Sequence, residues 1–357
     1  MGNVAINIRN LYKIFGSNSN EAIELVREGL GKDDLLEQRG NVLGINDISL
    51  EIEKNKIQVV MGLSGSGKST LIRLINRLIE PTAGEILLDG EDILAMSSIA
   101  LRETRRNKIS MVFQSFALFP HRTVIENVGY GLEVKGDRRK NIEKNAKRWI
   151  DRVGLSGYEN YYPSQLSGGM RQRVGLARAL TTDADILLMD EAFSALDPLI
   201  RAEMQDILLN LQEEIKKTIV FITHDLDEAL RIGDKISILR DGKIIQTDDP
   251  QNILLNPENT YVADFMKDIN RARILRVGSI MAKLNTNSEG PVMLESKTLE
   301  EALQSFENSP NKQTTIVNQS GKKIGTLTIE DLIRAMKRPD FKRKIESSRR
   351  LIRPNKT

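Results

Sequence analysis

The 357-residue chain contains no cysteine, only two histidines and a single tryptophan. Without cysteine, disulfides, thiolate metal sites and cysteine nucleophiles are excluded, and we expect an intracellular protein. No uncharged apolar run approaches the roughly 18–20 residues that span a bilayer. Residues 1–16 lack the basic and apolar regions of a secretory signal. If the protein acts at a membrane, we therefore expect another chain to anchor it.

Strong charge of one sign is also missing, except near the C-terminal end. The net charge is +3, but residues 337–357 hold nine Lys or Arg against Asp340 and Glu346, so the remainder is mildly acidic. This distribution argues against a nucleic-acid binder that uses its whole surface. The basic tail, 339–357, is interpreted either as a solvated end or as a salt-sensitive contact with anionic lipid.

Short apolar runs alternate with longer amphipathic segments over the first 270 residues. Segments 57–61, 185–190, 218–223 and 235–240 read as strands, and 69–79 has apolar residues at helical spacing. The central strands are apolar almost throughout, as expected where helices cover both faces of a sheet. The pattern predicts an α/β fold with a mainly parallel sheet.

Two segments interrupt this pattern, and the composition changes after it. Residues 22–40 predict a helical insertion, and 101–157 predict a helical subdomain. The change near residue 270, followed by turn-like residues 285–291, suggests a boundary. Beyond it, 298–308, 314–318, 322–328 and 329–338 predict a compact α-β-β-α module. We thus expect domains at 1–270 and 271–338, followed by the tail.

A phosphate loop is the most specific local feature. It has the G-x-x-x-x-G-K-S/T spacing, follows the strand 57–61 and opens the helix at 69. Its backbone N–H groups and the helix N-terminus suit phosphate, Lys68 can reach the β- and γ-phosphates, and the Ser69 hydroxyl can bind Mg²⁺. The alternative is a glycine-rich turn without a ligand. The predicted nucleotide-binding residues are Gly62, Leu63, Ser64, Gly65, Ser66, Gly67, Lys68, Ser69 and Thr70.

Two carboxylates end the apolar strand at 185–190. Asp190 would bind Mg²⁺, and Glu191 would polarise the attacking water, because phosphoryl transfer depends on positioning the nucleophile. By itself, such a strand end is more often a solvated turn; the phosphate loop favours the catalytic interpretation.

Further motifs resemble those of the ABC ATPases. Ser167, Gly168 and Gly169 resemble the LSGGQ signature, and 194–197 resembles the D-loop. The resemblance implies that Gln114 senses Mg²⁺ and the γ-phosphate, that His224 contacts the γ-phosphate, and that Phe15 stacks on adenine. Phe15 could instead be a core aromatic. Catalysis is thereby assigned to Glu191, His224 and Lys68, and Mg²⁺ binding to Ser69, Gln114 and Asp190.

The sequence around these motifs, over residues 4–268, is similar to that of the ATPases of glycine betaine, proline betaine and choline importers. The resemblance implies an ATP- and Mg²⁺-dependent, head-to-tail dimer with Ser167–Gly169 acting in trans. It also implies a membrane permease, a separate solute-binding protein, and a position on the cytoplasmic face of the membrane. The chain is only 4% aromatic, so it is ill suited to form an aromatic cage for a quaternary amine.

The C-terminal part resembles a single CBS module through Gly325, Thr328 and Asp331. In that family Thr328 and Asp331 would hold a ribose, but a helix cap explains the same spacing equally well. Two rival functions stay open: a soluble ABC ATPase acting on nucleic acid or ribosomes, and a mainly regulatory nucleotide binder. Against the first, the chain holds neither a second cassette nor a long coiled coil; against the second stands its complete hydrolytic set.

Overall fold

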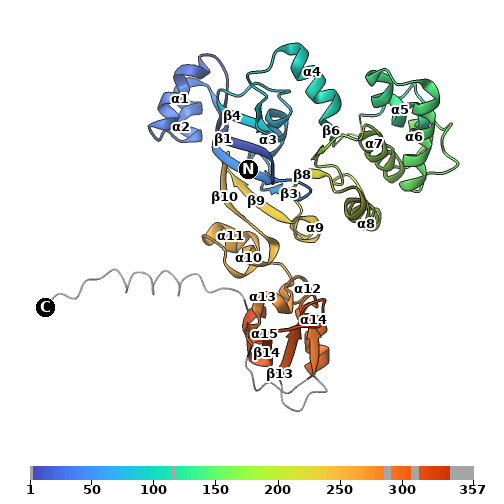
Figure 1. Cartoon of the computed structure of the whole chain (residues 1–357). Coiled ribbons are helices and arrows are strands. Elements are labelled where there is room, and N and C mark those ends of the chain that lie inside the picture. The colour runs from blue at the N-terminus through green and yellow to red at the C-terminus, as the bar shows by residue number, and fades with distance from the viewer. Residues whose placement is uncertain (1–2, 115–116, 285–290, 307–312, 338–357) are drawn as a thin grey trace. The chain divides into compact units, whose positions relative to one another are not determined.

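A computed structural model describes residues 3–114, 117–284, 291–306 and 313–337 (Figure 1). The chain divides into two compact units, and the division along the sequence falls between Ile245 and Gln246. The basic tail lies outside the described residues, as do most of the predicted turn at 285–291 and the end of the helix predicted at 298–308. No helix in the described ranges is long and apolar enough to cross a membrane.

The first unit is built on a six-stranded sheet with the order β10-β9-β3-β8-β7-β6, in which β9, β3, β8, β7 and β6 pair in parallel. Every residue of β3, β7 and β8 is buried, which explains their apolar sequences. The predicted parallel α/β fold is confirmed. The strands are β3 (Ile57–Met61), β6 (Ile109–Val112), β7 (Ile186–Asp190), β8 (Thr218–Thr223), β9 (Lys235–Arg240) and β10 (Lys243–Asp248).

A second, antiparallel sheet has the order β2-β1-β4-β5. Its apolar side chains join those of α3 (Lys68–Ile75) and the parallel strands in one core. The helix predicted at 69–79 ends earlier because the backbone turns at Arg77, whose φ is 47°. The four strands are β1 (Val4–Phe15), β2 (Val42–Glu53), β4 (Ala83–Leu88) and β5 (Glu91–Asp92).

The insertion predicted at 22–40 folds as two helices, α1 (Ser19–Arg27) and α2 (Lys32–Arg39). Their buried residues Ile23, Val26 and Leu35 pack with Tyr12 and other residues of β1 and β2. The insertion is therefore fixed to the antiparallel sheet by its own apolar cluster.

Helices α5, α6 and α7 pack against one another as a helical cluster beside the parallel sheet (Figure 1). The cluster differs from the expected subdomain at 101–157, because β6 lies within that range and joins the sheet, whereas α7 lies beyond it. The remaining helices of this unit flank the sheet. The bounds are α4 (Ser98–Asn107), α5 (Val124–Lys135), α6 (Arg139–Arg152), α7 (Gly168–Thr181), α8 (Pro198–Ile215) and α9 (Leu226–Ile232), with a 3₁₀ turn at Pro163–Gln165.

The second unit begins before the predicted boundary near residue 270. Arg271 links the two sides of that boundary, because its side chain donates to the carbonyls of Leu254 (2.6 Å) and Ala335 (2.8 Å). The unit also contains a four-stranded sheet of order β11-β14-β13-β12. The elements are α10 (Pro250–Leu255), α11 (Thr260–Phe265), α12 (Arg271–Ile274), α13 (Val277–Ile280), β11 (Ala282–Lys283), β12 (Val292–Leu294), α14 (Leu299–Phe306), β13 (Gln313–Val317), β14 (Lys323–Thr328) and α15 (Ile329–Met336).

Thr328 and Asp331 form a reciprocal cap at the start of α15. Thr328 Oγ1 donates to Asp331 Oδ2 (2.6 Å), and Asp331 N donates back to Thr328 Oγ1 (3.2 Å). The capping interpretation of this pair is therefore observed. The CBS resemblance stays a prediction.

Candidate functional site

The predicted site residues lie at the carboxyl ends of adjacent parallel strands. The phosphate loop follows β3, and Gln114 follows β6. Asp190 ends β7 with Glu191 directly after it, and His224 follows β8. The strands are aligned so that Met61 pairs with Thr223, and Asp190 with Ile222. Because parallel strands end at one edge, segments far apart in the sequence converge there.

The loop before α3 requires glycine at two tightly packed positions. Gly62 has a φ of 155°, and a Cβ there would lie 2.2 Å from the carbonyl oxygen of Leu239. Gly67 has a φ of 106°, and its Cβ would lie 2.5 Å from the carbonyl oxygen of Gly44. Neither position accepts a side chain without moving backbone. The loop is thus held between β2 and β9.

Lys68 is buried beneath this loop. Its Nζ donates to the carbonyl oxygens of Gly62 (2.8 Å) and Leu63 (3.1 Å), and lies 4.0 Å from Glu191 Oε1. Burial lowers the pKa of Lys68 below its usual range, while the carboxylates of Glu191 and Asp190 act in the opposite direction. Two of its partners are neutral carbonyls and the Glu191 carboxylate lies 4.0 Å away, so an anion such as phosphate would compensate the buried charge further.

Ser69 and Asp190 present oxygen atoms to one another. Ser69 Oγ donates to Asp190 Oδ1 (2.9 Å), and Arg73 Nη2 lies 3.9 Å from Asp190 Oδ2. Burial raises the pKa of Asp190 above its usual range, although the Ser69 hydrogen bond and the Arg73 charge lower it. A hydroxyl beside a carboxylate fits the oxygen-ligand preference of Mg²⁺.

Glu191 is the point at which the other predicted residues meet. Its Oε2 accepts from Gln114 Nε2 (3.1 Å) and lies 3.6 Å from His224 Nδ1. The residue has a left-handed φ of 47°, and its carbonyl accepts hydrogen bonds from the backbone and the side chain of Ser194. A strained backbone held by the following turn is a feature of functional sites.

A pocket of about 270 Å³ opens over the loop. Phe15, more than a third exposed, stands at its wall, with Lys13 Nζ 5.0 Å from the centroid of its ring. Residues that the sequence did not single out also line it, notably Lys32, whose place in the insertion offered no motif, and Gly44. The described lining residues are Phe15, Lys32, Val42, Leu43, Gly44, Ser64, Gly65, Gly67, Lys68, Ser69, Thr70 and Glu191.

The signature residues Ser167–Gly169 do not line this pocket. They begin α7, where Ser167 Oγ accepts from the backbone N–H of Met170 (3.2 Å). Ser167 is exposed, and a Cβ added at Gly168 would meet open space. The start of α7 is therefore accessible to a ligand or another chain.

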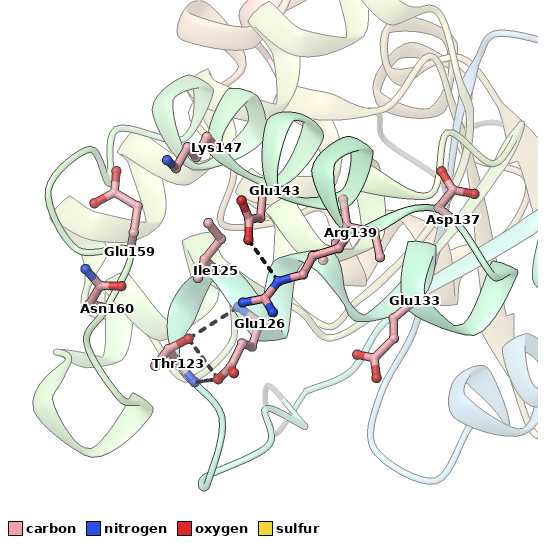
Figure 2. Close-up of a pocket in the computed structure, with 12 residues that line it drawn as sticks. Thr123, Ile125, Glu126, Glu133, Asp137, Arg139, Glu143, Lys147, Glu159 and Asn160 are labelled. Atoms are coloured by element: carbon pink, nitrogen blue, oxygen red, sulfur yellow. Dashed lines mark hydrogen bonds and ion pairs between the residues drawn. The ribbon is translucent and has the colours of Figure 1, made fainter.

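A larger hollow, about 1090 Å³, lies between α5 and α6 and holds none of the predicted site residues (Figure 2). Carboxylates of its lining interact with neighbouring residues of their own helix or its cap. Glu143 pairs with Arg139 (3.2 Å), and Glu126 accepts from Thr123 in a capping box. Its lining holds five carboxylates and two basic side chains, but none of the predicted catalytic residues.

Comparisons with known proteins agree on the family. The family model described as "ABC transporter" matches residues 45–194. The chain is 54% identical over 283 residues to the glycine betaine transport ATP-binding protein OpuAA of Bacillus subtilis (strain 168), covering 79% of this chain and 68% of that protein. The chain belongs to the ABC transporter ATP-binding proteins.

Another relative covers more of the chain. The glycine betaine/proline betaine transport system ATP-binding protein ProV of Salmonella typhimurium is 47% identical over 337 residues, covering 93% of this chain and 83% of that protein. A solved structure entitled "Dimeric Structure of MJ0796, a Bacterial ABC Transporter Cassette" matches with a TM-score of 0.59 and 31% identity, covering 69% of this chain and 98% of that one. The predicted ABC ATPase fold and ATP-hydrolysing class are confirmed.

Proposed function

We propose that this ABC ATPase energises the uptake of glycine betaine, proline betaine or a related quaternary amine. The solute class is supported by what the relatives OpuAA and ProV are named for. The observation that carries the ATPase mechanism is the convergence of Lys68, Ser69, Asp190, Glu191 and His224 at one sheet edge. These relatives support transport over action on nucleic acid or ribosomes.

In the proposed mechanism, Lys68 binds the β- and γ-phosphates and Phe15 stacks on adenine. Ser69, Gln114 and Asp190 would hold Mg²⁺, which would neutralise phosphate charge when bound. Glu191 orients and polarises the attacking water.

His224 is proposed to contact the γ-phosphate. Its imidazole is more than half exposed and lies 3.6 Å from Glu191, so it can reach both the carboxylate and a bound phosphate. The Gln114 amide donates its N–H to the same Glu191 oxygen, so its carbonyl oxygen would be the atom that binds the metal. One side chain would then link the metal to Glu191.

We further propose that the working unit is a head-to-tail dimer. The start of α7 would complete the nucleotide site of the partner subunit, which fits its accessibility and its separation from the pocket lining. Mixing Gly168→Glu chains with Glu191→Gln chains tests this arrangement. If the signature acts in trans, the mixed dimer regains one intact site and partial activity, whereas each variant alone is inactive. No recovery on mixing would contradict the trans arrangement.

The dimer is proposed to act on the cytoplasmic face of the membrane with a permease and, indirectly, a solute-binding protein. The decisive experiment measures ATPase activity in vesicles containing the permease, with glycine betaine, choline or proline supplied through the binding protein. Stimulation by a quaternary amine supports the proposal. An ATPase rate indifferent to all three solutes would argue against this solute class.

Residues 271–338 are proposed to form a CBS-like regulatory module, pairing across the dimer, and the basic tail to contact anionic lipid. Because such a contact is screened by salt, the tail would make transport respond to ionic strength. Deletion after Lys337 should then abolish the salt dependence of transport in vesicles containing anionic lipid. An unchanged salt response would refute the lipid role.

A further inference from the structure

The insertion contributes a positive charge to the nucleotide pocket. Lys32, the first residue of α2, donates from Nζ to the carbonyl oxygen of Gly65 in the phosphate loop (3.2 Å). The same side chain lines the pocket together with Phe15 and Lys68. A cation from outside the nucleotide-binding motifs therefore stands beside the loop that receives phosphate.

Packing beneath α2 fixes the helix that carries this cation. Leu35, one turn further along the helix, is fully buried in a cluster with Tyr12, Ile14 and Leu43. Those partners belong to β1 and β2, the strands that also carry Phe15 and Gly44 to the pocket wall. Because the helix and the pocket wall share one apolar cluster, Lys32 is directed at the site by the fold.

Lys32 does not stabilise its own helix from this position. A positive side chain in the first turn opposes the helix dipole, whereas Asp33 and Asp34 in the same turn complement it. The ammonium has three N–H donors, and the Gly65 carbonyl occupies one. Nucleotide binding would bring several negative charges to this loop, within reach of a flexible four-carbon side chain.

We propose that Lys32 is a nucleotide-recognising residue whose ammonium transfers from the Gly65 carbonyl to the polyphosphate of ATP. The insertion then forms part of the nucleotide site. This role rests on ATP binding in the pocket described above. Lys32 contributes to nucleotide binding, and other residues carry out the hydrolytic step.

The test uses the purified full-length chain and fluorescence titrations with ATP, ADP and adenosine. Lys32→Met retains the length of the side chain but removes its charge and donors; Lys32→Arg restores both. Arg39→Met removes a charge from the exposed end of the same helix, outside the pocket lining, and serves as the matched control. We expect Lys32→Met to weaken ATP binding about fivefold, ADP binding less, and adenosine binding not at all.

The ATP effect of Lys32→Met should shrink as salt is raised, because the attraction is screened, and Lys32→Arg should bind ATP within about twofold of the wild type. Unchanged ATP affinity in Lys32→Met, or an equal loss in Arg39→Met, would overturn the role of Lys32. Parallel losses of adenosine affinity and thermal stability would assign it to the structure instead. A wild-type chain that binds no ATP would overturn the proposed function, and this role with it.

Discussion

Replacement of Glu191 by Gln is the sharpest test of the proposed hydrolytic site. The substitution preserves the shape of the side chain and an oxygen that can accept from Gln114, but removes the negative charge 3.6 Å from His224 Nδ1 and 4.0 Å from Lys68 Nζ. A water once polarised by a carboxylate would meet a neutral amide. ATP binding should not require that charge, because Lys68 and the loop backbone are the groups proposed to hold the phosphates.

The expected loss is in turnover. A positioned general base contributes about 10²–10⁴-fold, which corresponds to about 3–5 kcal/mol of transition-state stabilisation. Without nucleotide, buried Lys68 loses its nearby carboxylate and keeps two carbonyl partners. We therefore expect the free energy of unfolding of the nucleotide-free variant to fall by about 1 kcal/mol, with ATP reversing that loss.

Three measurements check this reasoning: the steady-state ATPase rate, the ATP dissociation constant, and the melting temperature with and without ATP. Glu213→Gln removes an exposed carboxylate from α8 and should leave all three unchanged. The assignment of Glu191 is refuted if its Gln variant hydrolyses ATP at more than about a tenth of the wild-type rate. Lost ATP binding with lost turnover would instead place Glu191 in substrate binding.

Three further variants test the site. Asp190→Asn should raise the melting temperature of the nucleotide-free protein at neutral pH and abolish Mg²⁺-dependent turnover. Burial raises the folded-state pKa of Asp190, so the stability of the wild type falls as the pH rises from the usual pKa of an aspartate through that raised value. The Asn variant should lose this pH dependence. A lower melting temperature for the variant would contradict the argument. Gly44→Ala puts a Cβ 2.8 Å from the Phe15 ring and should raise the KM for ATP about two- to tenfold at constant kcat; an unchanged KM removes Phe15 from the site. Gly67→Ala should abolish ATP binding and lower the free energy of unfolding by more than about 1 kcal/mol, as titration and denaturation would show; normal ATP affinity would refute the rigid-loop argument.

Much of the first unit was predictable from the sequence. The strands β3, β8 and β9 match their predicted ranges, and β7 differs by one residue, because buried parallel strands are continuous apolar runs whose ends are marked by polar residues. The phosphate loop was recognisable because its spacing and its flanking strand and helix occur together. Element boundaries were less predictable where a single backbone angle decided them, as at Arg77.

Local sequence alone could not decide which distant residues meet. Strand order brings Gln114, Glu191 and His224 within bonding reach, because neighbours in a parallel sheet are far apart along the chain. The same holds for Lys32, whose place beside Gly65 depends on the packing of Leu35 against two strands. The sequence by itself determined the phosphate loop and the carboxylate pair through residue spacing, and the family through the resemblance of its motifs. Only the tertiary structure decided that the insertion reaches the pocket over the phosphate loop, since burial of an apolar cluster sets that contact.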